Sequence, residues 1–584
     1  MGTHQQLAKL RAVGDCTLQP CAYVGPGFIS SPPHRVGVAH LTCMRRFLLA
    51  DPVGCGKTAQ TLVAFGYLRE RLPGGLRMVV LTPKSALFQW HHAVGKFLVG
   101  IEAEVVGYDK RRTPLTVSDR HMQYRHSTAD ILISTYHTAA RDIDALREGL
   151  DGHDGQRLVV VFDEVQTLGN QGQRLLYPNA LKLAQSADYV WGLSATPMGN
   201  RLEELHAVFE AIRPGTFGSH KAFMATYVRR IWIKNPNGKG RQRGFWKVLG
   251  YKNLDQLKAT ITPLHLKRPA NVIDQHLPEV VTKDVHIEMT ARQREIYDQI
   301  VAQRFPASGI DDEGRPLNKL ASLCYAQMAS DAPEVLGFVG VGSAKADWLL
   351  TFLQQAVTEK VIVYARYRRV VDYLCERLTG AIIPHVRITG AEDAKARDDA
   401  RQRFNTAPPS TDHASHPAID AEEQSLNEQA SRDASTGVNV IVLNAAGGQA
   451  LDLQSANIVV FFDLPWSWGE YQQVLGRSRR IGSIHSKILS LLPANTTSID
   501  LATRDLLIHK ETLVQRTLGL DEAERSLTAQ VENCKNTEHS INSPLEEIKT
   551  ESTSLLPTEV LTMSSPEALE TTKLFRCVAP STYI

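Results

Sequence analysis

The stretch "LLADPVGCGKTAQTL", residues 48–62, joins an apolar run to a glycine-rich turn and a helix-like pattern. Residues 47–50 predict the end of a buried strand, and the apolar spacing over 58–68 predicts a helix. Gly54 and Gly56 permit a turn whose backbone N–H groups point at an anion. A helix N-terminus favours a bound phosphate, so the stretch predicts a phosphate-binding loop.

The loop also carries two side chains that suit a nucleotide. Lys57 is expected to reach the β- and γ-phosphates, and the Thr58 hydroxyl to bind Mg²⁺. Cys55 lies inside the loop, where we expect a small passive residue. The strict loop pattern has glycine at the position of Asp51. Taken by itself, the stretch is also compatible with a glycine-rich turn beside a solvated lysine.

Length and composition indicate a globular protein of several domains. The chain has 584 residues, with 43% hydrophobic and 22% charged residues, enough for roughly two to four domains. It has neither an apolar run of about 18 residues, as a membrane span requires, nor an apolar signal core. The eight cysteines include no C-x-x-C pair, so neither a zinc ribbon nor a disulfide framework is expected. We expect an intracellular protein without membrane contact, nuclear if eukaryotic and cytoplasmic if bacterial or viral.

Charge is unevenly distributed, although the net charge is only +3. Residues 406–437 carry −5 and residues 521–584 carry −6, which leaves +14 on the remainder. A basic body with acidic appendages suits a polyanionic partner such as nucleic acid, and the acidic tail is a candidate surface for protein partners. An ordinary basic surface is the alternative.

Apolar runs that end in polar residues recur in two sets, with helix-like stretches between them. The first set is MVVLTP (78–83), DILIST (130–135), LVVVFDE (158–164) and YVWGLSATP (189–197); the second is KVIVYAR (360–366), VRITG (386–390), VNVIVLN (438–444) and NIVVFFDLP (457–465). The pattern predicts two α/β lobes, each a parallel sheet with crossover helices.

The lobe boundaries follow from the same pattern. We expect an N-terminal extension over 1–33, a first lobe over 34–270, a helical linker over 271–334, a second lobe over 335–519 and a tail over 520–584. The polar segment 406–437 is predicted to be a disordered insertion in the second lobe, and the Ser/Thr-rich tail to be mostly disordered.

Two charged motifs complement the phosphate loop. Asp163 and Glu164 directly follow a buried strand, where one acid can hold Mg²⁺ while a second orients the attacking water. Arg477 and Arg480 are three residues apart, so we expect them to share a helix face and to neutralise charge on the transferring phosphoryl group. A common acidic pair and a basic surface helix are the alternatives.

Together these motifs identify a resemblance to the Swi/Snf-type branch of superfamily-two helicases and DNA translocases, over about residues 34–515. The motifs that carry it are LADPVGCGKT, LTPKSALFQW, ILISTYHT, VFDEVQTLGN, GLSATPMGN, VIVYARYRRVVDYL, LNAAGGQALDLQSANIVVFFDLPW and QQVLGRSRRIGS. The resemblance implies two RecA-like lobes with a nucleotide cleft between them, ATP and Mg²⁺ as cofactors, and DNA as the partner.

The resemblance implies a role for each residue at a matching position. Nucleotide contacts are implied for Gly54, Cys55, Gly56, Lys57, Thr58, Arg35, Gln473 and Gly448, metal contacts for Thr58 and Asp163, catalysis for Asp163, Glu164, Arg477 and Arg480, coupling of hydrolysis to lobe movement for Ser194, Ala195 and Thr196, and DNA-phosphate contacts for Lys84, Ser85, Thr135 and Arg366.

Three departures from the family pattern are visible. Arg35 stands where the family usually has the glutamine that reads adenine, which puts selectivity for ATP in question. Gln166 replaces the usual histidine of the acidic motif. GGQALDLQSA replaces the common GGxGLNLTxA, which affects the expected coupling.

The segment 227–268 narrows the branch, because it is basic and aromatic and then helical. It resembles the HARP-like annealing-helicase branch, and phage and bacterial relatives of that branch are equally close. Arg241 and Arg243, with Trp232 and Trp246, are expected to bind a DNA fork by charge and stacking. An exposed β-hairpin without a role in DNA binding is the alternative.

The sequence therefore favours a DNA-dependent ATPase that translocates on duplex or forked DNA. A strand-separating DNA or RNA helicase is the alternative among enzymes. A DNA-binding scaffold with weak catalysis, switched by nucleotide, is the alternative from another class, and the presence of Lys57, Asp163, Glu164, Arg477 and Arg480 argues against it.

Overall fold

The structure is a computed structural model, and it forms two compact units divided between His276 and Leu277. It describes residues 21–26, 32–72, 74–151, 155–169, 175–199, 201–234, 244–268, 277–302, 319–392, 394–406, 438–445, 453–479 and 483–518. The predicted disorder of the acidic insertion and of the tail lies outside these residues. Within them, every helix is too short or too polar to cross a membrane.

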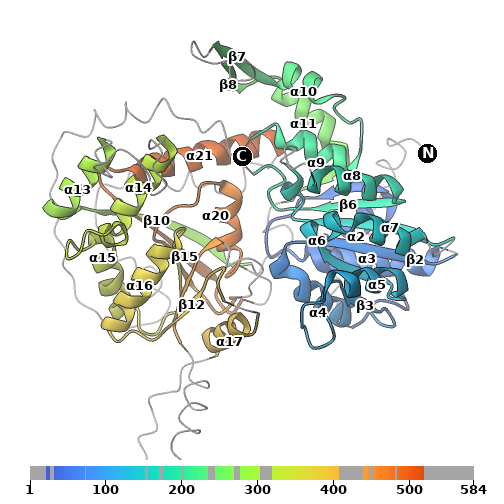
Figure 1. Cartoon of the computed structure of the whole chain (residues 1–584), viewed down its shortest axis with the longest axis horizontal. Helices are drawn as coiled ribbons and strands as arrows, with labels where there is room; N and C mark the ends of the chain where they lie inside the picture. The colour runs from blue at the N-terminus through green and yellow to red at the C-terminus, as the bar shows by residue number, and fades with distance from the viewer. Residues whose placement is uncertain are drawn as a thin grey trace, which may run out of the picture. The chain divides into compact units, whose positions relative to one another are not determined.

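The first unit is built on a seven-stranded sheet in the order β3-β4-β2-β5-β6-β1-β9 (Figure 1). Its strands are β1 (Arg46–Leu49), β2 (Leu76–Thr82), β3 (Ala103–Val105), β4 (Ile131–Thr135), β5 (Arg157–Asp163), β6 (Tyr189–Leu193) and β9 (His265–Leu266). All neighbouring strands are parallel. Every residue of β2 is buried, as expected of a central parallel strand covered on both faces. The predicted strand that precedes the phosphate loop and the four apolar runs of the first set are confirmed.

Helices flank this sheet (Figure 1). They are α2 (Pro32–Cys43), α3 (Lys57–Arg71), α4 (Leu87–Phe97), α5 (Val117–His126), α6 (Tyr136–Arg141), α7 (Ile143–Asp151), α8 (Leu176–Ser186), α9 (Glu204–Ile212), α10 (His220–Tyr227) and α11 (Leu254–Ile261), with short 3-10 turns η1 (Lys84–Ala86), η2 (Val165–Gly169) and η4 (Thr262–Leu264). The hydroxyls of Thr116, Thr135 and Ser219 cap α5, α6 and α10 by accepting a backbone N–H of the first turn, which explains where these helices begin. The helix predicted over 58–68 is confirmed as part of α3.

An antiparallel hairpin extends away from this sheet (Figure 1). It consists of β7 (Val228–Lys234) and β8 (Gly244–Tyr251), and it includes a bulge between Arg229 and Arg230. The residues between the strands, with Arg241 and Arg243, lie outside the described part of the chain. The sequence alternative of an exposed β-hairpin is confirmed in its structure, while its role in DNA binding stays a prediction.

The second unit has a six-stranded parallel sheet in the order β10-β15-β14-β11-β13-β12. The strands are β10 (Glu279–Ile287), β11 (Val361–Tyr364), β12 (His385–Ile388), β13 (Val440–Leu443), β14 (Ile458–Phe461) and β15 (Lys487–Asn495). The helices and turns are α13 (Ala291–Val301), α14 (Lys319–Asp331), η5 (Pro333–Leu336), α15 (Ala344–Gln355), α16 (Arg368–Gly380), α17 (Ala394–Asn405), α20 (Trp468–Leu475) and α21 (Ile499–Leu518). The four apolar runs of the second set are confirmed as strands.

The structure corrects the separate helical linker that we predicted over 271–334. β10 pairs with β15 along its whole length and is the edge strand of the second sheet. The buried side chains of Ile296 and Tyr297 on α13 share one apolar cluster with Ala326 and Ala329 on α14. The described part of this segment therefore belongs to the second unit, because it supplies both a strand and packed helices.

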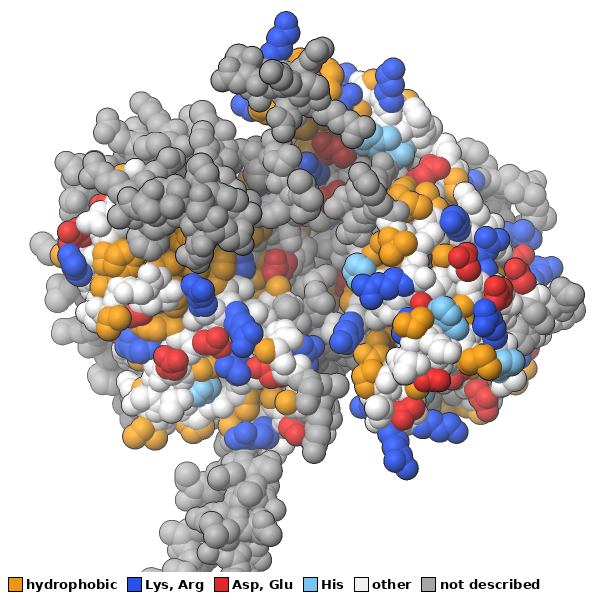
Figure 2. Space-filling view, viewed as in Figure 1, with side chains coloured by type: hydrophobic (Ala, Val, Ile, Leu, Met, Phe, Trp, Pro, Cys, Tyr) orange, Lys and Arg blue, Asp and Glu red, His pale blue; other side chains and the backbone are white. Residues whose placement is uncertain are grey.

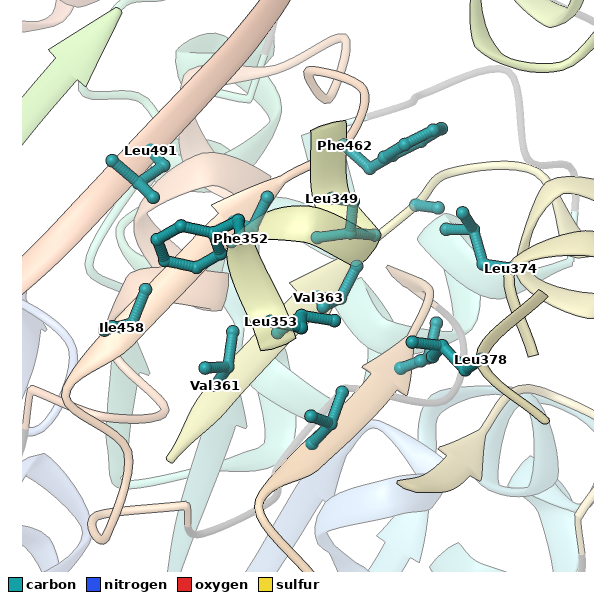
Figure 3. Close-up of a cluster of buried hydrophobic side chains, with 14 of the residues drawn as sticks. Leu349, Phe352, Leu353, Val361, Val363, Leu374, Leu378, Ile458, Phe462 and Leu491 are labelled. Atoms are coloured by element: carbon teal, nitrogen blue, oxygen red, sulfur yellow. The ribbon is translucent and has the colours of Figure 1, made fainter. Parts of the chain in front are cut away.

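The core of the second unit lies between its sheet and the helices α15 and α16 (Figure 3). Leu349, Phe352 and Leu353 of α15 and Leu374 and Leu378 of α16 are buried against strand side chains. The strand residues in this cluster are Val361, Val363, Val440, Val442, Ile458, Val460, Leu489 and Leu491. Burial of this apolar surface gives the second sheet its stability.

A polar network also lies inside the second unit. The side chain of Lys345 is fully buried, and its Nζ lies 2.8 Å from Asp331 Oδ1 and 3.2 Å from Asp500 Oδ2. Asp500 also accepts hydrogen bonds from Gln327 Nε2 and Ser330 Oγ. Burial alone would lower the pKa of Lys345, but the two carboxylates raise it above its usual range. The lysine therefore stays charged and joins α14, α15 and the start of α21.

Candidate functional site

Three predicted motifs of the first unit follow three neighbouring strands, β5, β6 and β1. In the register of these strands Leu193 lies beside Leu49 on one side and beside Asp163 on the other. Because parallel strands end at the same edge, the segments that follow them emerge side by side. The phosphate loop, the acidic pair and the 194–196 turn are therefore brought together.

The phosphate loop has the backbone that its glycines were expected to allow. Gly54 and Gly56 have φ angles of 83° and 70°, a region that favours glycine. Cys55 between them is buried, and α3 begins at Lys57. The Nζ of Lys57 donates to the carbonyl oxygens of Asp51 (2.8 Å) and Pro52 (2.9 Å). The loop thus aligns a helix N-terminus and a cation, as anion binding requires.

Thr58 lies in the first turn of α3, next to Lys57. A threonine hydroxyl here and a carboxylate oxygen of Asp163 are hard oxygen ligands of the kind that Mg²⁺ prefers. The described residues contain no cluster of three or more His, Cys, Asp or Glu side chains that could hold a metal. The residues therefore fit an ion held by few protein ligands together with substrate phosphates, as is usual for Mg²⁺.

Asp163 ends β5 and is fixed by two neutral donors. Its Oδ2 accepts hydrogen bonds from Thr82 Oγ1 (2.7 Å) and Trp90 Nε1 (2.8 Å). Burial, followed by the charge of Glu164, raises the pKa of Asp163 to about 6, while Trp90 and Thr82 oppose that rise. A nearby cation would favour the ionised carboxylate. The carboxylate is thus oriented by hydrogen bonds and suited to bind a positive ion.

Glu164 is held in an uncommon conformation and belongs to a hydrogen-bonded chain. Its φ is 51°, a left-handed value that is costly for a residue with a side chain. Gln166 Nε2 donates to Glu164 Oε2 at 2.5 Å, and Ser194 Oγ donates to Gln166 Oε1 at 2.6 Å. Ser194 Oγ in turn accepts the backbone N–H of Thr196 at 3.0 Å. Gln166 therefore connects the acidic pair to the predicted coupling residues, where Ala195 is also buried.

The predicted DNA contacts of the first unit lie on neighbouring segments. Lys84 is exposed and Ser85 half-buried in η1, just after β2. Thr135 ends β4 beside Thr82 in the register of the sheet, and its hydroxyl caps α6. The two segments therefore emerge together at the same edge as the nucleotide motifs, and their contact with DNA stays a prediction.

Arg35 lies on α2, close to the phosphate loop. The neighbouring His34 is so near the loop that a Cβ on Gly56 would lie 3.0 Å from His34 Nε2. Arg35 is half-buried. This placement is compatible with a nucleotide contact, which remains a prediction.

The second unit supplies Gln473 on α20, where the side chain is half-buried. Gly448 and Arg480 lie outside the described residues. The prediction that Arg477 lies on a helix is wrong, because α20 ends at Leu475. Arg477 is 7% exposed in the turn that follows, and its carbonyl accepts the backbone N–H of Leu453. Its role as an arginine finger remains a prediction.

The structure also corrects Arg366, which we predicted to contact DNA. Its backbone N–H donates to Asp463 Oδ1 at 2.6 Å, and its Nη2 donates to the carbonyl of Leu464. Its guanidinium packs over the ring of Trp466, with the guanidinium carbon 4.4 Å from the ring centre, and its Nε and Nη1 are buried. A guanidinium enclosed in this way serves packing inside the unit and is withdrawn from DNA.

Sequence reasoning missed several residues that position the site. Thr82 and Trp90 lie within LTPKSALFQW, but nothing in the spacing distinguished them as partners of Asp163. Tyr136 follows β4, and its hydroxyl donates to the carbonyl of Asp163. Arg268, which pairs with Asp51, is 217 positions away in the sequence. Only the folded chain reveals these contacts.

Gln166 generates a direct test of the hydrogen-bonded chain. We expect Gln166→Ala to lower kcat for ATP hydrolysis by roughly 10- to 100-fold with little change in KM, because Glu164 then loses the group that orients it. Steady-state kinetics would measure both constants. Gln185→Ala, at an exposed position on α8, is the matched control and should leave them unchanged. An unaltered kcat in Gln166→Ala would show that the chain does not serve turnover.

Curated relatives span most of the chain at low identity. An uncharacterized ATP-dependent helicase of Mycoplasma genitalium is 22% identical over 81% of this chain and 40% of its own length. The SWI/SNF-related matrix-associated actin-dependent regulator of chromatin subfamily A-like protein 1 of Xenopus tropicalis is 26% identical over 83% of this chain and 44% of its own length. The chain therefore spans less than half the length of these relatives.

Among solved structures, the Sulfolobus solfataricus SWI2/SNF2 ATPase core in complex with double-stranded DNA is 20% identical. The match covers 91% of this chain and 98% of that one, with a TM-score of 0.35.

Two family models match the chain in consecutive segments. The model for the helicase conserved C-terminal domain matches residues 413–482. The model for the SNF2-related domain matches residues 37–328, which is half of the chain and includes the phosphate loop, the acidic pair and the 194–196 turn. The chain therefore belongs to the family of ATPases that carry an SNF2-related domain.

Proposed function

We propose that this chain is a DNA-stimulated ATPase that moves along duplex DNA without separating its strands. The observation that carries the proposal is the set of three nucleotide motifs on β1, β5 and β6, joined through Gln166. A loop that only bound nucleotide would need neither a Glu164 fixed beside Asp163 nor a hydrogen-bonded link to Ser194. These features support hydrolysis coupled to movement over a nucleotide-switched scaffold.

The proposed chemistry assigns separate tasks to the two acids. Lys57 binds the β- and γ-phosphates, and Glu164 orients the water that attacks the γ-phosphate. Thr58 and Asp163 would hold Mg²⁺, which supplies positive charge to the phosphates. Arg477 belongs to the second unit, as does Arg480, and in this proposal both neutralise charge that develops during transfer.

Nucleotide selection is part of the same proposal. Arg35 lies on α2 near the phosphate loop, where it could accept a base different from adenine, so ATP is proposed from the family and not from a reading of the base. Gln473 and Gly448 are the proposed nucleotide contacts of the second unit.

DNA binding through the backbone suits a protein that must move. Lys84 and Ser85 after β2, together with Thr135 before α6, offer a cation, a hydroxyl and helix N-terminal N–H groups. These groups bind phosphate and read no base sequence. We propose that they contact one strand of the duplex.

The β7–β8 hairpin is the proposed contact for forked DNA. Ile231, Trp232, Phe245, Trp246 and Leu249 are 44–58% exposed on it. Trp232 and Trp246 are opposite one another across the strands, with ring centres 5.3 Å apart. The segment 227–252 contains eight Lys and Arg residues and no Asp or Glu. Figure 2 shows Lys and Arg beside hydrophobic side chains where Figure 1 places this hairpin.

This composition matches the two interactions that bind unpaired nucleic acid. Aromatic faces stack on bases, and cationic side chains attract the phosphates. The guanidinium carbon of Arg230 lies 4.5 Å from the centre of the Trp246 ring, which keeps that ring edge beside a positive charge. We propose that the hairpin binds the single-stranded arms of a fork.

Movement without strand separation is tested by two displacement assays with the same enzyme. We expect ATP-dependent displacement of a third strand from a triplex, because a translocase removes obstacles from an intact duplex. We expect no efficient separation of a plain duplex under the same conditions. Both activities should fall steeply as salt rises, because phosphate contacts dominate binding.

The opposite pattern would reject the proposal. Efficient strand separation without triplex displacement would favour the helicase alternative. DNA binding and ATP binding without either activity would favour the scaffold.

The hairpin is tested with a double variant, Trp232→Ala/Trp246→Ala. We expect its affinity for a fork with single-stranded arms to fall by roughly tenfold, because stacking contributes about 1–3 kcal/mol per base. Affinity for linear duplex should change much less, and fluorescence anisotropy would measure both. Val117→Ala, which removes an exposed apolar side chain of α5, is the control. Equal losses on fork and linear duplex would contradict a fork-specific contact.

A further inference from the structure

Asp51 presents a problem that the nucleotide motifs do not explain. It replaces the first glycine of the strict phosphate-loop pattern, and its side chain is fully buried. A buried carboxylate is unfavourable unless a positive group and hydrogen bonds compensate it. Its place at the start of a loop that binds anionic phosphates makes compensation doubly necessary.

Arg268 supplies that compensation. Its Nε donates to Asp51 Oδ1 at 3.1 Å and its Nη2 donates to Asp51 Oδ2, so the guanidinium binds both carboxylate oxygens. The side chain of Arg268 is only 11% exposed. Two parallel hydrogen bonds to one carboxylate fix direction as well as charge. The pair therefore determines where the loop begins.

The same guanidinium reaches two other elements. Its Nη1 donates to the carbonyl of Pro33 on α2, and its Nη2 also donates to Gln60 Oε1 on α3 at 3.2 Å. Gln60 Nε2 donates to the carbonyl of Cys55 at 3.0 Å. Arg268 thus connects the start of the loop, its glycine-rich turn and the helix on each side.

This arrangement leaves no room for a side chain on the facing turn of α2. A Cβ on Gly37 would lie 1.7 Å from Gln60 Oε1 and 3.3 Å from Arg268 Nη2. The glycine therefore permits α2 to approach the cluster closely, and the cluster is a packed part of the loop.

Strand pairing explains how residues so distant in sequence meet. β9 pairs with β1 in parallel, with Leu266 beside Leu49. Asp51 and Arg268 each lie two residues beyond the end of their strand, at the same edge of the sheet. The next residue back, Lys267, donates to the carbonyl of Ala195 at 3.4 Å. The segment after β9 thus contacts both the phosphate loop and the 194–196 turn.

We propose that Arg268 is a positioning residue for the phosphate loop. By holding Asp51, it fixes the carbonyl oxygens to which Lys57 donates and neutralises a buried negative charge beside the phosphate site. Nucleotide affinity therefore depends on a residue that does not contact the nucleotide. This inference rests on the proposed function in so far as the loop binds ATP.

Equilibrium binding of a fluorescent ATP analogue with Mg²⁺ tests the inference on the full chain. We expect Arg268→Met to weaken binding by at least roughly tenfold, because the unpaired Asp51 carboxylate repels the phosphates and releases the loop. Arg268→Lys keeps the charge but not the paired hydrogen bonds, so its affinity should be intermediate. Lys258→Met, at an exposed position on α11, is the control and should bind as the wild type does.

The double variant Asp51→Asn/Arg268→Met separates positioning from simple stabilisation, and it serves even if Arg268→Met fails to fold. It removes the buried charge together with its partner, so we expect it to fold and to bind the analogue more tightly than Arg268→Met does. Where the single variant does not fold, tighter binding by the double variant than by Asp51→Asn/Arg268→Glu supports the proposal. Wild-type affinity in folded Arg268→Met would overturn it, as would a double variant that binds no better than the single.

Failure of the proposed function would look different. A wild-type protein that binds the analogue but shows no DNA-stimulated hydrolysis would reject the translocase and leave the affinity comparison intact.

Discussion

The parallel pairing of β1, β5 and β6 is the constraint on which the rest of the site depends. Leu49, Leu193 and Asp163 are neighbours across three strands that run in one direction. The loops after these strands must therefore emerge together, whatever their distance in sequence. A parallel sheet requires crossover helices on its faces, and that requirement accounts for the continuous apolar runs that the strands show. The chemistry is thus placed by the same pattern that forms the core.

Buried charges in both units are compensated within hydrogen-bonded clusters. In the first unit Asp51 is paired with Arg268, and in the second Lys345 is paired with Asp331 and Asp500. Breaking one partner of such a pair leaves an uncompensated charge, which is much more costly than the pair itself is stabilising. Such clusters specify one arrangement of the surrounding elements. In the first unit the element so fixed is the phosphate loop, so specificity of packing and function coincide there.

Much of this fold follows from the sequence, and what could not be predicted has physical causes. Buried central strands such as β2 and β5 are continuous apolar runs, so they were recognisable. β9 has two residues, β10 is a polar edge strand, and β15 contains Pro493, which argues against a strand. The missed strands explain the incorrect linker, because β10 belongs to the second sheet only through its pairing with β15.

Site residues divide in the same way. Lys57, Thr58, Asp163 and Glu164 were identified because short local motifs define them. Arg268 could not be, because its contact with Asp51 depends on the pairing of β9 with β1. Spacing within QQVLGRSRRIGS suggested a helix at Arg477, but α20 ends before it. Local sequence therefore predicts the groups that act, and tertiary pairing determines the groups that hold them.

The most direct test of the central claim is the rate of ATP hydrolysis at saturating ATP while duplex DNA is added. The account predicts that the wild-type rate rises with duplex concentration to a plateau, and that Lys57→Ala stays at background throughout. A wild-type rate that does not respond to duplex DNA, or a DNA-stimulated rate that persists in Lys57→Ala, would contradict it.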